Sequence, residues 1–308
     1  MPIPFNPNAD DDGDGLSNGQ ELTLGTDPTK KDTDGDGVND PVEIADGTNP
    51  NDANSYNSLN KGLVAYYPFN GNANDESGNG KHGVVLGATL ATDRFGVANR
   101  NYHFSGTNQW IYANNIPEPT NNSFTWSCWI LAEGDLFGSE SLRYILNRNN
   151  NNLDNQVSPH LTLREQGRFM FASYSMPLGH EGNLQNNVLS TPSAQWTTNR
   201  WIHLIATSGA DNVRRIYVNG LMVCESVSSD YGQTGLGTLN IGADRMPAAD
   251  NPYFMQGKID EVRIYDRTLT SAETSQLYQQ EVGNLDSDGD GLTDAWERGY
   301  GRYDIVPP

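Results

Sequence analysis

Short runs of alternating or β-branched apolar residues recur between residues 61 and 283, separated by turns rich in glycine and asparagine. A period of two places every second side chain on the same face of a strand. Runs of strand length at this density, without helices between them, predict an antiparallel β-sandwich. The predicted strands are 63–69, 82–90, 101–104, 110–113, 124–131, 143–147, 160–163, 168–174, 201–208, 214–218, 221–227, 239–241 and 258–265.

One turn and one helix in this region have local signals of their own. Asn219-Gly220 lies between apolar flanks and is typical of a two-residue type I′ hairpin turn. Residues 272–281 predict a helix, with Ser271 as the expected N-cap and Gly283 beyond its end. The predicted fold class is therefore all-β, an antiparallel jelly-roll sandwich with one short helix after the last strand.

The first 60 residues lack this pattern and contain an internal repeat instead. A shift of 22 residues superposes Asp10 on Asp32, Glu21 on Glu43, and GTDP (25–28) on GTNP (47–50). The repeat has too few apolar residues for a core, so metal binding must supply its folding free energy. We assign residues 1–60 to a repeat domain ending in a polar linker (51–60), 61–283 to the sandwich, and 284–308 to a further, truncated repeat.

Each repeat contains twelve residues with the ligand spacing of a calcium loop. Hard oxygen ligands stand at loop positions 1, 3, 5, 9 and 12, glycine at position 6 allows a sharp turn, and position 7 offers its carbonyl. Without a cation, carboxylates this close together would repel one another, so Ca²⁺ is the predicted cofactor. The predicted ligands are Asp10, Asp12, Asp14, Leu16, Asn18 and Glu21; Asp32, Asp34, Asp36, Val38, Asp40 and Glu43; and Asp286, Asp288, Asp290, Leu292, Asp294 and Glu297.

These loops differ from EF-hands. Loop position 8 is polar in all three, as Ser17, Asn39 or Thr293, and Asp27-Pro28 prevents a helix before the second loop. The pattern resembles thrombospondin type 3 repeats, in the cysteine-free form found in bacterial surface proteins. That resemblance implies a compact calcium-filled spacer in which neighbouring repeats share ligands.

The order of phrases across 61–283 resembles the laminin-G-like jelly roll of the concanavalin A-like lectin/glucanase fold. The phrases are GLVAYYPFNGNANDESGNGKHG (62–83), YHFSGTNQWIYA (102–113), FTWSCWI (124–130), WIHLIAT (201–207), RIYVNGLMV (215–223), LNIGAD (239–244) and GKIDEVRIYDRTLTSAE (257–273). The resemblance implies a mostly non-catalytic module that binds carbohydrate. It also implies a structural calcium between the first and last strands, with Asp75 and Asp260 as candidate ligands. The alternative is that Asp75 caps a turn and Asp260 bonds to backbone.

The distribution of charge excludes two classes of partner. The formal net charge is −20, and residues 1–60 hold 13 acidic and 2 basic side chains, so most of the excess belongs to the calcium loops. A chain without a basic stripe is a poor partner for nucleic acid or anionic lipid. No apolar run approaches the roughly 20 residues of a membrane span.

The expected location is secreted or at the cell surface, although MPIPFNPN lacks the features of a signal peptide. Acidic calcium modules of this kind are often weak and would stand empty in the cytosol. Cys128 and Cys224 could form a disulfide, but each lies in a strand-like apolar run, which favours free thiols.

The known catalytic patterns do not fit the chain. Glu133-Gly134-Asp135 only begins the E-x-D-x-x-E strand of related glycoside hydrolases, and there is no HExxH or GxSxG. We therefore expect no enzyme. The candidate sugar-stacking aromatics are Trp110 and Tyr112, which would share one strand face, and Tyr174, Tyr231 and Tyr253, which lie near turns.

The leading hypothesis is a secreted, calcium-binding, lectin-like module that binds an extracellular glycan or cell-surface ligand. It would act together with other domains of a longer chain. The alternative is a purely structural spacer, or a protein-adhesion module, that has no sugar site.

Overall fold

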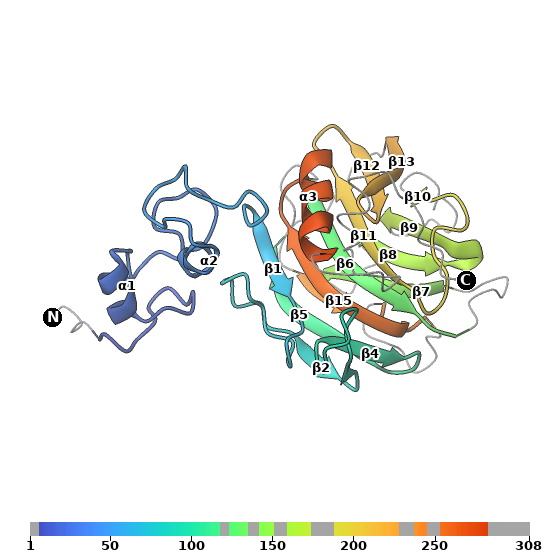
Figure 1. The fold of residues 1–308 in the computed structure, drawn as a ribbon, viewed down its shortest axis with the longest axis horizontal. Coiled ribbons are helices and arrows are strands. Elements are labelled where there is room, and N and C mark those ends of the chain that lie inside the picture. The colour runs from blue at the N-terminus through green and yellow to red at the C-terminus, as the bar shows by residue number, and fades with distance from the viewer. Residues whose placement is uncertain are drawn as a thin grey trace.

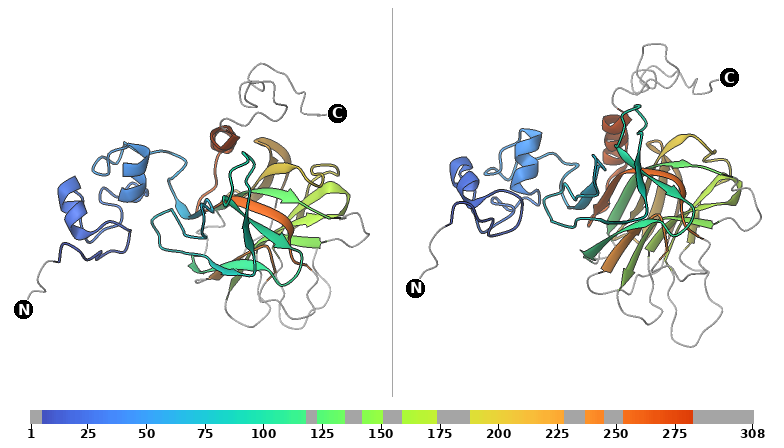
Figure 2. Two further views of the ribbon diagram at one scale, coloured as in Figure 1. Left: turned by 60° about the horizontal axis from the view of Figure 1, so that its bottom comes forward. Right: turned by 90° about the horizontal axis from the view of Figure 1, so that it is seen from below.

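The computed structural model describes residues 6–117, 123–134, 142–150, 159–173, 188–227, 237–244 and 253–282. It shows the two repeats as a small body that lies beside a two-sheet sandwich (Figure 1). Further views show the repeats projecting from one side of the sandwich, on the side where β1 begins (Figure 2).

Each repeat contains one short helix after its calcium loop. α1 (Asn18–Leu24) begins with a capping box formed by Ser17 and Gln20, and α2 (Asp40–Asp46) has a proline in its first turn. Both helices end at a glycine in the left-handed conformation, with φ of 81° at Gly25 and 74° at Gly47. Each of the two described repeats thus has a short helix between its calcium loop and the glycine that follows.

The sandwich consists of two antiparallel sheets, which confirms the predicted fold class. The eight-stranded sheet contains, in spatial order, β13 (Leu221–Val227), β12 (Val213–Val218), β11 (Trp201–Ser208), β6 (Phe124–Ala132), β15 (Gln256–Tyr265), β4 (Asn101–Ser105) and β3 (Thr89–Ala91), with β1 (Leu63–Tyr67) paired to β15. The seven-stranded sheet contains β10 (Val188–Ser190), β9 (Arg168–Ser173), β8 (Pro159–Arg164), β7 (Leu142–Asn150), β14 (Gly237–Ile241), β5 (Trp110–Ile116) and β2 (Val84–Leu86). A 3₁₀ turn, η2 (Glu165–Gly167), joins β8 to β9.

Most predicted strands form, with two differences. The run predicted at 82–90 divides into β2 and β3, which belong to different sheets, and β10 was not predicted. The hairpin turn has the predicted geometry, with φ of 49° at Asn219 and 76° at Gly220 between paired Val218 and Leu221.

Aromatic side chains join the two sheets across the core. Phe171 of β9 lies with its ring centroid 5.7 Å from that of Phe124 and 6.1 Å from that of Trp126, both on β6 in the opposite sheet. All three side chains are almost completely buried. Cys128 lies in the same core, and both it and Cys224 are free thiols, as favoured from the sequence.

Helix α3 (Ser271–Val282) covers the outer face of the eight-stranded sheet (Figure 1). Leu277 packs with Ile205 and Tyr217 of that face. The N-cap is Thr270 rather than the predicted Ser271, because Thr270 Oγ1 accepts from the backbone N–H of Glu273 at 3.2 Å, and the Glu273 side chain accepts from Thr270 N–H at 2.8 Å.

The carboxyl end of α3 is held by a buried polar cluster. Glu281 accepts a hydrogen bond from Trp129 Nε1 at 2.6 Å and forms an ion pair with Arg263. His203 is fully buried, with Nε2 3.2 Å from Glu281, and its ring stacks with Trp129 and Tyr278. This environment makes His203 a packed strand residue.

Replacing Phe171 by alanine should lower the free energy of unfolding of the sandwich by about 3–5 kcal/mol, because it leaves a cavity between the two sheets. Urea unfolding measures the change. Met222→Ala is the control, since Met222 is 49 % exposed and its loss should stay within about 0.5 kcal/mol. Equal effects of the two substitutions would contradict the placement of the core.

Candidate calcium and ligand sites

The two described calcium loops have the same backbone geometry. In the second loop, Asp32 at position 1 accepts from the backbone N–H groups of Gly35 and Gly37, both at 2.8 Å. Asp10 makes the equivalent two bonds in the first loop, at 2.7 and 3.2 Å. The glycines can follow this turn because their φ angles are positive. The 22-residue repeat of the sequence is therefore also a repeat of structure.

The remaining carboxylates leave buried oxygens without a donor. The aspartates at positions 3 and 5 each accept one backbone N–H through Oδ1, which closes the turn. The oxygens with no hydrogen-bond partner within the described part of the chain include Oδ2 of Asp12, Asp14, Asp34 and Asp36, both carboxylate oxygens of Glu21, and Oε2 of Glu43. Burying such oxygens is costly unless a cation binds them, so these residues fit Ca²⁺.

The spacing of the carboxylates also fits one ion in each loop. Ligand oxygens lie within 4.8 Å of one another in the group Asp10, Asp12 and Asp14, and in the group Asp32, Asp34 and Asp36. Calcium binds oxygen at about 2.3–2.6 Å, so two ligands on one ion can be up to about 5 Å apart.

Asp40 lies with the first loop rather than with its own. Its carboxylate, with those of Asp14 and Glu21, forms a third group within 4.8 Å, and all three residues are buried. Asp40 also accepts from Thr33 N–H at 2.9 Å, which fixes its orientation. The position-9 aspartate of one repeat thus joins the cluster of the repeat before it, whereas the sequence pattern predicted it as a ligand of its own loop.

Burial raises the pKa values of several of these groups. Burial, and then the neighbouring carboxylates, raise the pKa of Glu21 to about 7 and that of Asp14 to about 6. Burial and the charges of Asp34 and Asp36 likewise raise the pKa of Glu43 to about 7. These carboxyl groups take up protons readily when no cation balances their charge.

The remaining predicted calcium ligands differ in what the structure shows of their contacts. Asn18 uses its side chain within its own repeat, accepting from Asp11 N–H at 3.1 Å and donating to the Asn6 carbonyl at 3.0 Å. The carbonyl groups of Leu16 and Val38 stay predicted ligands. The third loop lies outside the described residues: Asp286, Asp288, Asp290, Leu292, Asp294 and Glu297.

Asp75 and Asp260 are not brought into one carboxylate group among the described residues. Asp75 caps a turn, because it accepts backbone N–H groups from Tyr66 and Ser77 at 2.9 Å and from Lys81 at 2.8 Å. Asp260 forms a buried ion pair with Arg94 at 2.9 Å, which already supplies a positive charge. Asp260 also accepts from Glu261 N–H at 2.9 Å, so both aspartates make the contacts of the alternative stated from the sequence. A structural calcium at these two residues stays a prediction.

A row of polar side chains crosses the outer face of the seven-stranded sheet. Tyr112 on β5 pairs with Asn240 on β14, which pairs with Asn147 on β7, which pairs with His160 on β8. The residues that alternate with these four along the strands point into the core; they are Ile111, Leu239 and Leu161. We call Tyr112, Asn240, Asn147 and His160 the polar row; at the usual strand spacing it spans about 14 Å.

Two atoms of the polar row are buried and lack a partner within the described residues. They are Oδ1 of Asn147, an acceptor, and Nδ2 of Asn240, a donor, and their residues are 2 % and 3 % exposed. Asn147 Nδ2 donates to Asp244 Oδ1 at 3.3 Å, which sets the orientation of the Asn147 amide. Buried polar groups of this kind require a bound partner, either water or a ligand.

Aromatic side chains flank the polar row. Trp110 and Tyr112 share one face of β5, as predicted, and the Trp110 ring lies 6.3 Å from that of Phe254. Tyr253 is 37 % exposed and its ring lies 6.5 Å from that of Tyr144. The other two predicted aromatics, Tyr174 and Tyr231, lie outside the described residues.

The sequence pattern did not predict Asn147, Asn240 and His160 as site residues. Their strands are far apart along the chain, and only the strand order brings them together. The available signal was a polar residue at an alternating position of an otherwise apolar strand, as in LNI (239–241).

The family comparison matches this architecture. A family model described as the concanavalin A-like lectin/glucanases superfamily matches residues 105–275, which is more than half of the chain. The chain belongs to this superfamily. A model of the bacterial TSP3 repeat matches residues 10–31, 32–53 and 286–301, so the superfamily domain is flanked by these repeats. No curated protein sequence matches the chain.

Solved structures show the same fold at low identity. Domain 4 of AbnA, a GH43 extracellular arabinanase from Geobacillus stearothermophilus solved in complex with arabinotriose, is 21% identical with a TM-score of 0.53, covering 70% of this chain and 98% of that one. The botulinum neurotoxin serotype D binding domain is 19% identical with a TM-score of 0.55, covering 74% and 54%. The chain therefore spans about half the length of that toxin domain. In the described part of this chain, no helix is both long enough and apolar enough to cross a membrane.

Calcium affinity should rise from about pH 5.5 to about pH 7.5, because Glu21 and Glu43, with pKa values of about 7, must lose their protons to bind the ion. The same raised values mean that the cation-free repeats lose stability as the pH rises through this range. Titration calorimetry in buffers of different ionisation enthalpy measures affinity and proton release together. Affinity that is constant over the range, with no proton release, would contradict the assignment of these two ligands.

Proposed function

We propose that the protein is a secreted, non-enzymatic module that binds an extracellular glycan through the outer face of its seven-stranded sheet. Calcium ions hold the repeats in shape, and the repeats form a spacer beside the glycan-binding sandwich. The proposal includes other domains of a longer chain, which the module would direct to a glycan-bearing surface.

The polar row is the observation that carries this proposal. Sugar hydroxyl groups both donate and accept hydrogen bonds, so they complement the free acceptor of Asn147 and the free donor of Asn240 at the same time. Tyr112 at one end of the row offers a ring of the kind that packs against the apolar face of a sugar. The arabinotriose complex of the similar arabinanase domain supports the same class of ligand.

The chemistry of this face supports binding rather than hydrolysis. Glycosidases generally use two carboxyl groups that face each other about 5–9.5 Å apart across the scissile bond. The polar row contains no carboxylate, and Asp244 is the single carboxylate with a recorded hydrogen bond to it in the described residues. Similarity to a toxin binding domain points in the same direction.

The proposed extracellular location follows from the proposed calcium binding. The clustered carboxylates need divalent cations at a concentration that fills weak sites, which extracellular fluid provides and cytosol does not. The bacterial TSP3 repeats and the extracellular arabinanase relative support this location.

A second candidate function is a structural spacer without a sugar site. The observation that favours it is the hydrogen-bonded contact between the second repeat and the sandwich, which would fix their relative orientation. A spacer makes no use of the unpartnered amide atoms in the polar row, and for that reason we favour glycan binding.

Asn240→Asp should weaken glycan binding by about five- to 150-fold, because it removes the Nδ2 donor at nearly constant shape, a loss of about 1–3 kcal/mol. A glycan array run in calcium identifies the ligand class, and calorimetry with that glycan measures the change. Asn51→Ala is the control, since Asn51 is exposed in the repeats. Unchanged affinity in a folded Asn240→Asp protein would contradict the assigned face, and no binding by the wild type would favour the spacer.

A further inference from the structure

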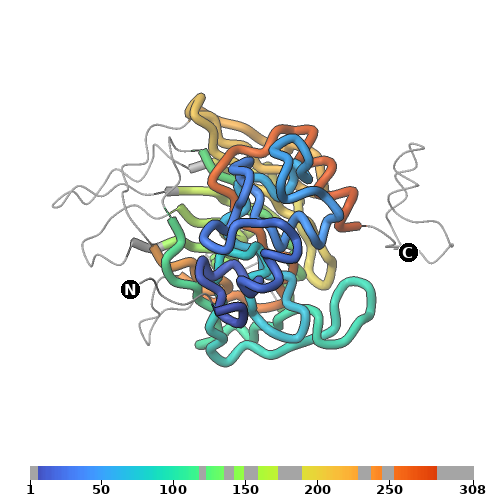
Figure 3. The backbone as a smooth tube through the Cα atoms, turned by 90° about the vertical axis from the view of Figure 1, so that its left-hand side faces the viewer, coloured from blue at the N-terminus to red at the C-terminus, as the bar shows by residue number. Residues whose placement is uncertain are grey.

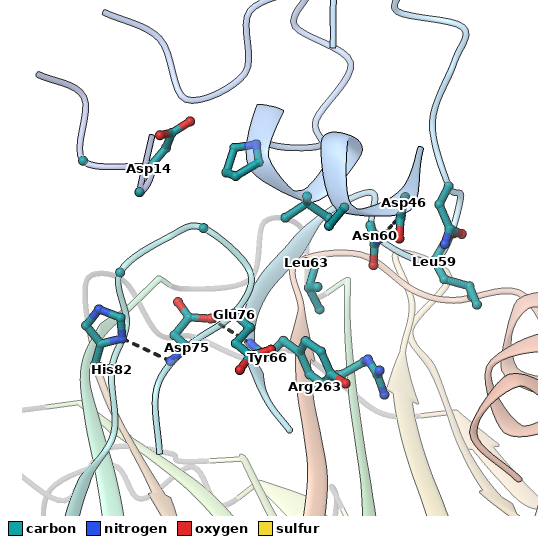
Figure 4. A pocket seen from close by; sticks show the side chains of 18 of the residues that line it. Asp14, Asp46, Leu59, Asn60, Leu63, Tyr66, Asp75, Glu76, His82 and Arg263 are labelled. Carbon is teal, nitrogen blue, oxygen red and sulfur yellow. Dashed lines mark hydrogen bonds between the residues drawn. The ribbon is translucent and has the colours of Figure 1, made fainter. Parts of the chain in front are cut away.

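The second calcium loop contacts the sandwich directly. Figure 4 shows α2 and the first loop above β1 and the 75–82 segment. The groove lined by these elements has a volume of about 580 Å³. At the edge of this junction, Asn39 Nδ2 donates to the Ser77 carbonyl at 3.0 Å and lies 3.3 Å from Asn79 Oδ1. Gly62, just before β1, donates its N–H to the Gly37 carbonyl at 3.3 Å.

A lysine joins both loops to the same part of the sandwich. Lys31 precedes the second loop, and its ammonium group donates to the Gly13 carbonyl of the first loop at 2.5 Å and to the Gly78 carbonyl at 3.4 Å. The backbone approaches closely here: a Cβ on Gly78 would lie 3.0 Å from Asn39 Nδ2. The surface formed by Ser77, Gly78 and Asn79, which we call the docking turn, therefore receives the second loop in close contact.

The residues that make this contact are positioned by the calcium ligands. Gly37 and Asn39 lie on either side of Val38, whose carbonyl is the predicted position-7 ligand of the second loop. Asp40 follows Asn39 and belongs to the carboxylate group of the first loop. Ions in the two loops would therefore fix the backbone on both sides of Asn39. Without them, repulsion among the carboxylates acts on the same few residues.

Of the two described repeats, the second makes this contact. Position 8 of the loop is Asn39 here, but Ser17 and Thr293 in the other two repeats. Only an amide at this position offers two N–H donors, which the Ser77 carbonyl and the Asn79 side chain can accept together. Ser17 instead uses its side chain to cap α1.

The segment between the two bodies is anchored to the sandwich. Leu59 is 2 % exposed and packs with Leu63 and Leu277, although the sequence predicted a polar linker here. Arg267 Nε donates to the Lys61 carbonyl at 2.6 Å. In the end-on view the repeats lie in front of the sandwich (Figure 3). With the connecting segment held, the loop contact decides the orientation of the repeats.

We propose that the docking turn is a calcium-dependent interaction surface that takes the second calcium loop as its ligand. Calcium in the first two loops presents Gly37 and Asn39 to the sandwich and makes the repeats and sandwich one rigid unit. Loss of calcium releases the repeats, which then move about residues 51–58. This inference rests on calcium binding by the loops but is independent of the glycan site.

Hydrogen exchange of the full chain, measured in calcium and in chelator, tests the proposal. The amide of Gly62 and those of the docking turn should exchange at least tenfold faster in chelator, while β6 and β11 in the sandwich core keep their protection. Small-angle scattering of the same samples should show a larger radius of gyration in chelator. A calorimetric calcium titration, run in parallel, establishes that the loops bind the ion.

Asn39→Ala separates docking from calcium binding. It removes the amide but no proposed calcium ligand, so the protein should keep its calcium stoichiometry yet show fast exchange at Gly62 even in calcium. Asn51→Ala should behave as the wild type does. If calcium binds but exchange at Gly62 and the docking turn is the same with and without it, the proposal is wrong. Slow exchange at Gly62 in calcium-loaded Asn39→Ala would also overturn it, as would a titration that detects no calcium binding.

Discussion

The cost of burying carboxylate oxygens without a donor is the constraint on which the repeats depend. Glu21 is fully buried with neither oxygen partnered within the described residues, and the apolar side chains Leu22 and Leu24 beside it are exposed. Such a segment has no hydrophobic core to offset the loss of hydration. A bound cation solves both problems, because it balances the charge and supplies folding free energy. The position of Asp40 in the first cluster extends this dependence from one repeat to the next.

The sandwich depends on a different set of forces. Its stability comes from apolar side chains between two sheets, and α3 adds a second apolar layer on one outer face. Four of its buried charged side chains form two ion pairs, Glu281 with Arg263 and Asp260 with Arg94. The opposite outer face carries the polar row instead, where Asn147 Oδ1 and Asn240 Nδ2 have no hydrogen-bond partner in the described part of the chain. This difference between the two faces is why we place the ligand on the seven-stranded sheet.

The sequence predicted those features that depend on local spacing. The grouping of the Asp32, Asp34 and Asp36 carboxylates follows from a twelve-residue pattern. The Asn219-Gly220 turn follows from the φ angles that the two residues can adopt. The strands were predicted where alternation persists over several residues. The three-residue β10 was missed because so short a run has no measurable period.

Features that depend on contacts between distant segments of the chain could not be predicted from the sequence pattern. Asn147 and Asn240 become neighbours only through the order of β7 and β14 in the sheet. Asp40 was assigned to its own loop because spacing alone does not show that it points toward the preceding repeat. Leu59 was assigned to a linker because one apolar residue in a polar stretch gives no period, yet it packs beneath α3.

Differential scanning calorimetry of the full chain, in millimolar calcium and in chelator, tests the central claim that cations hold the repeats in shape. In calcium, the unfolding enthalpy should include the repeats and the melting temperature should be higher. In chelator, only the unfolding of the sandwich should remain, with a smaller enthalpy. A transition with the same temperature and enthalpy in both conditions would contradict the account.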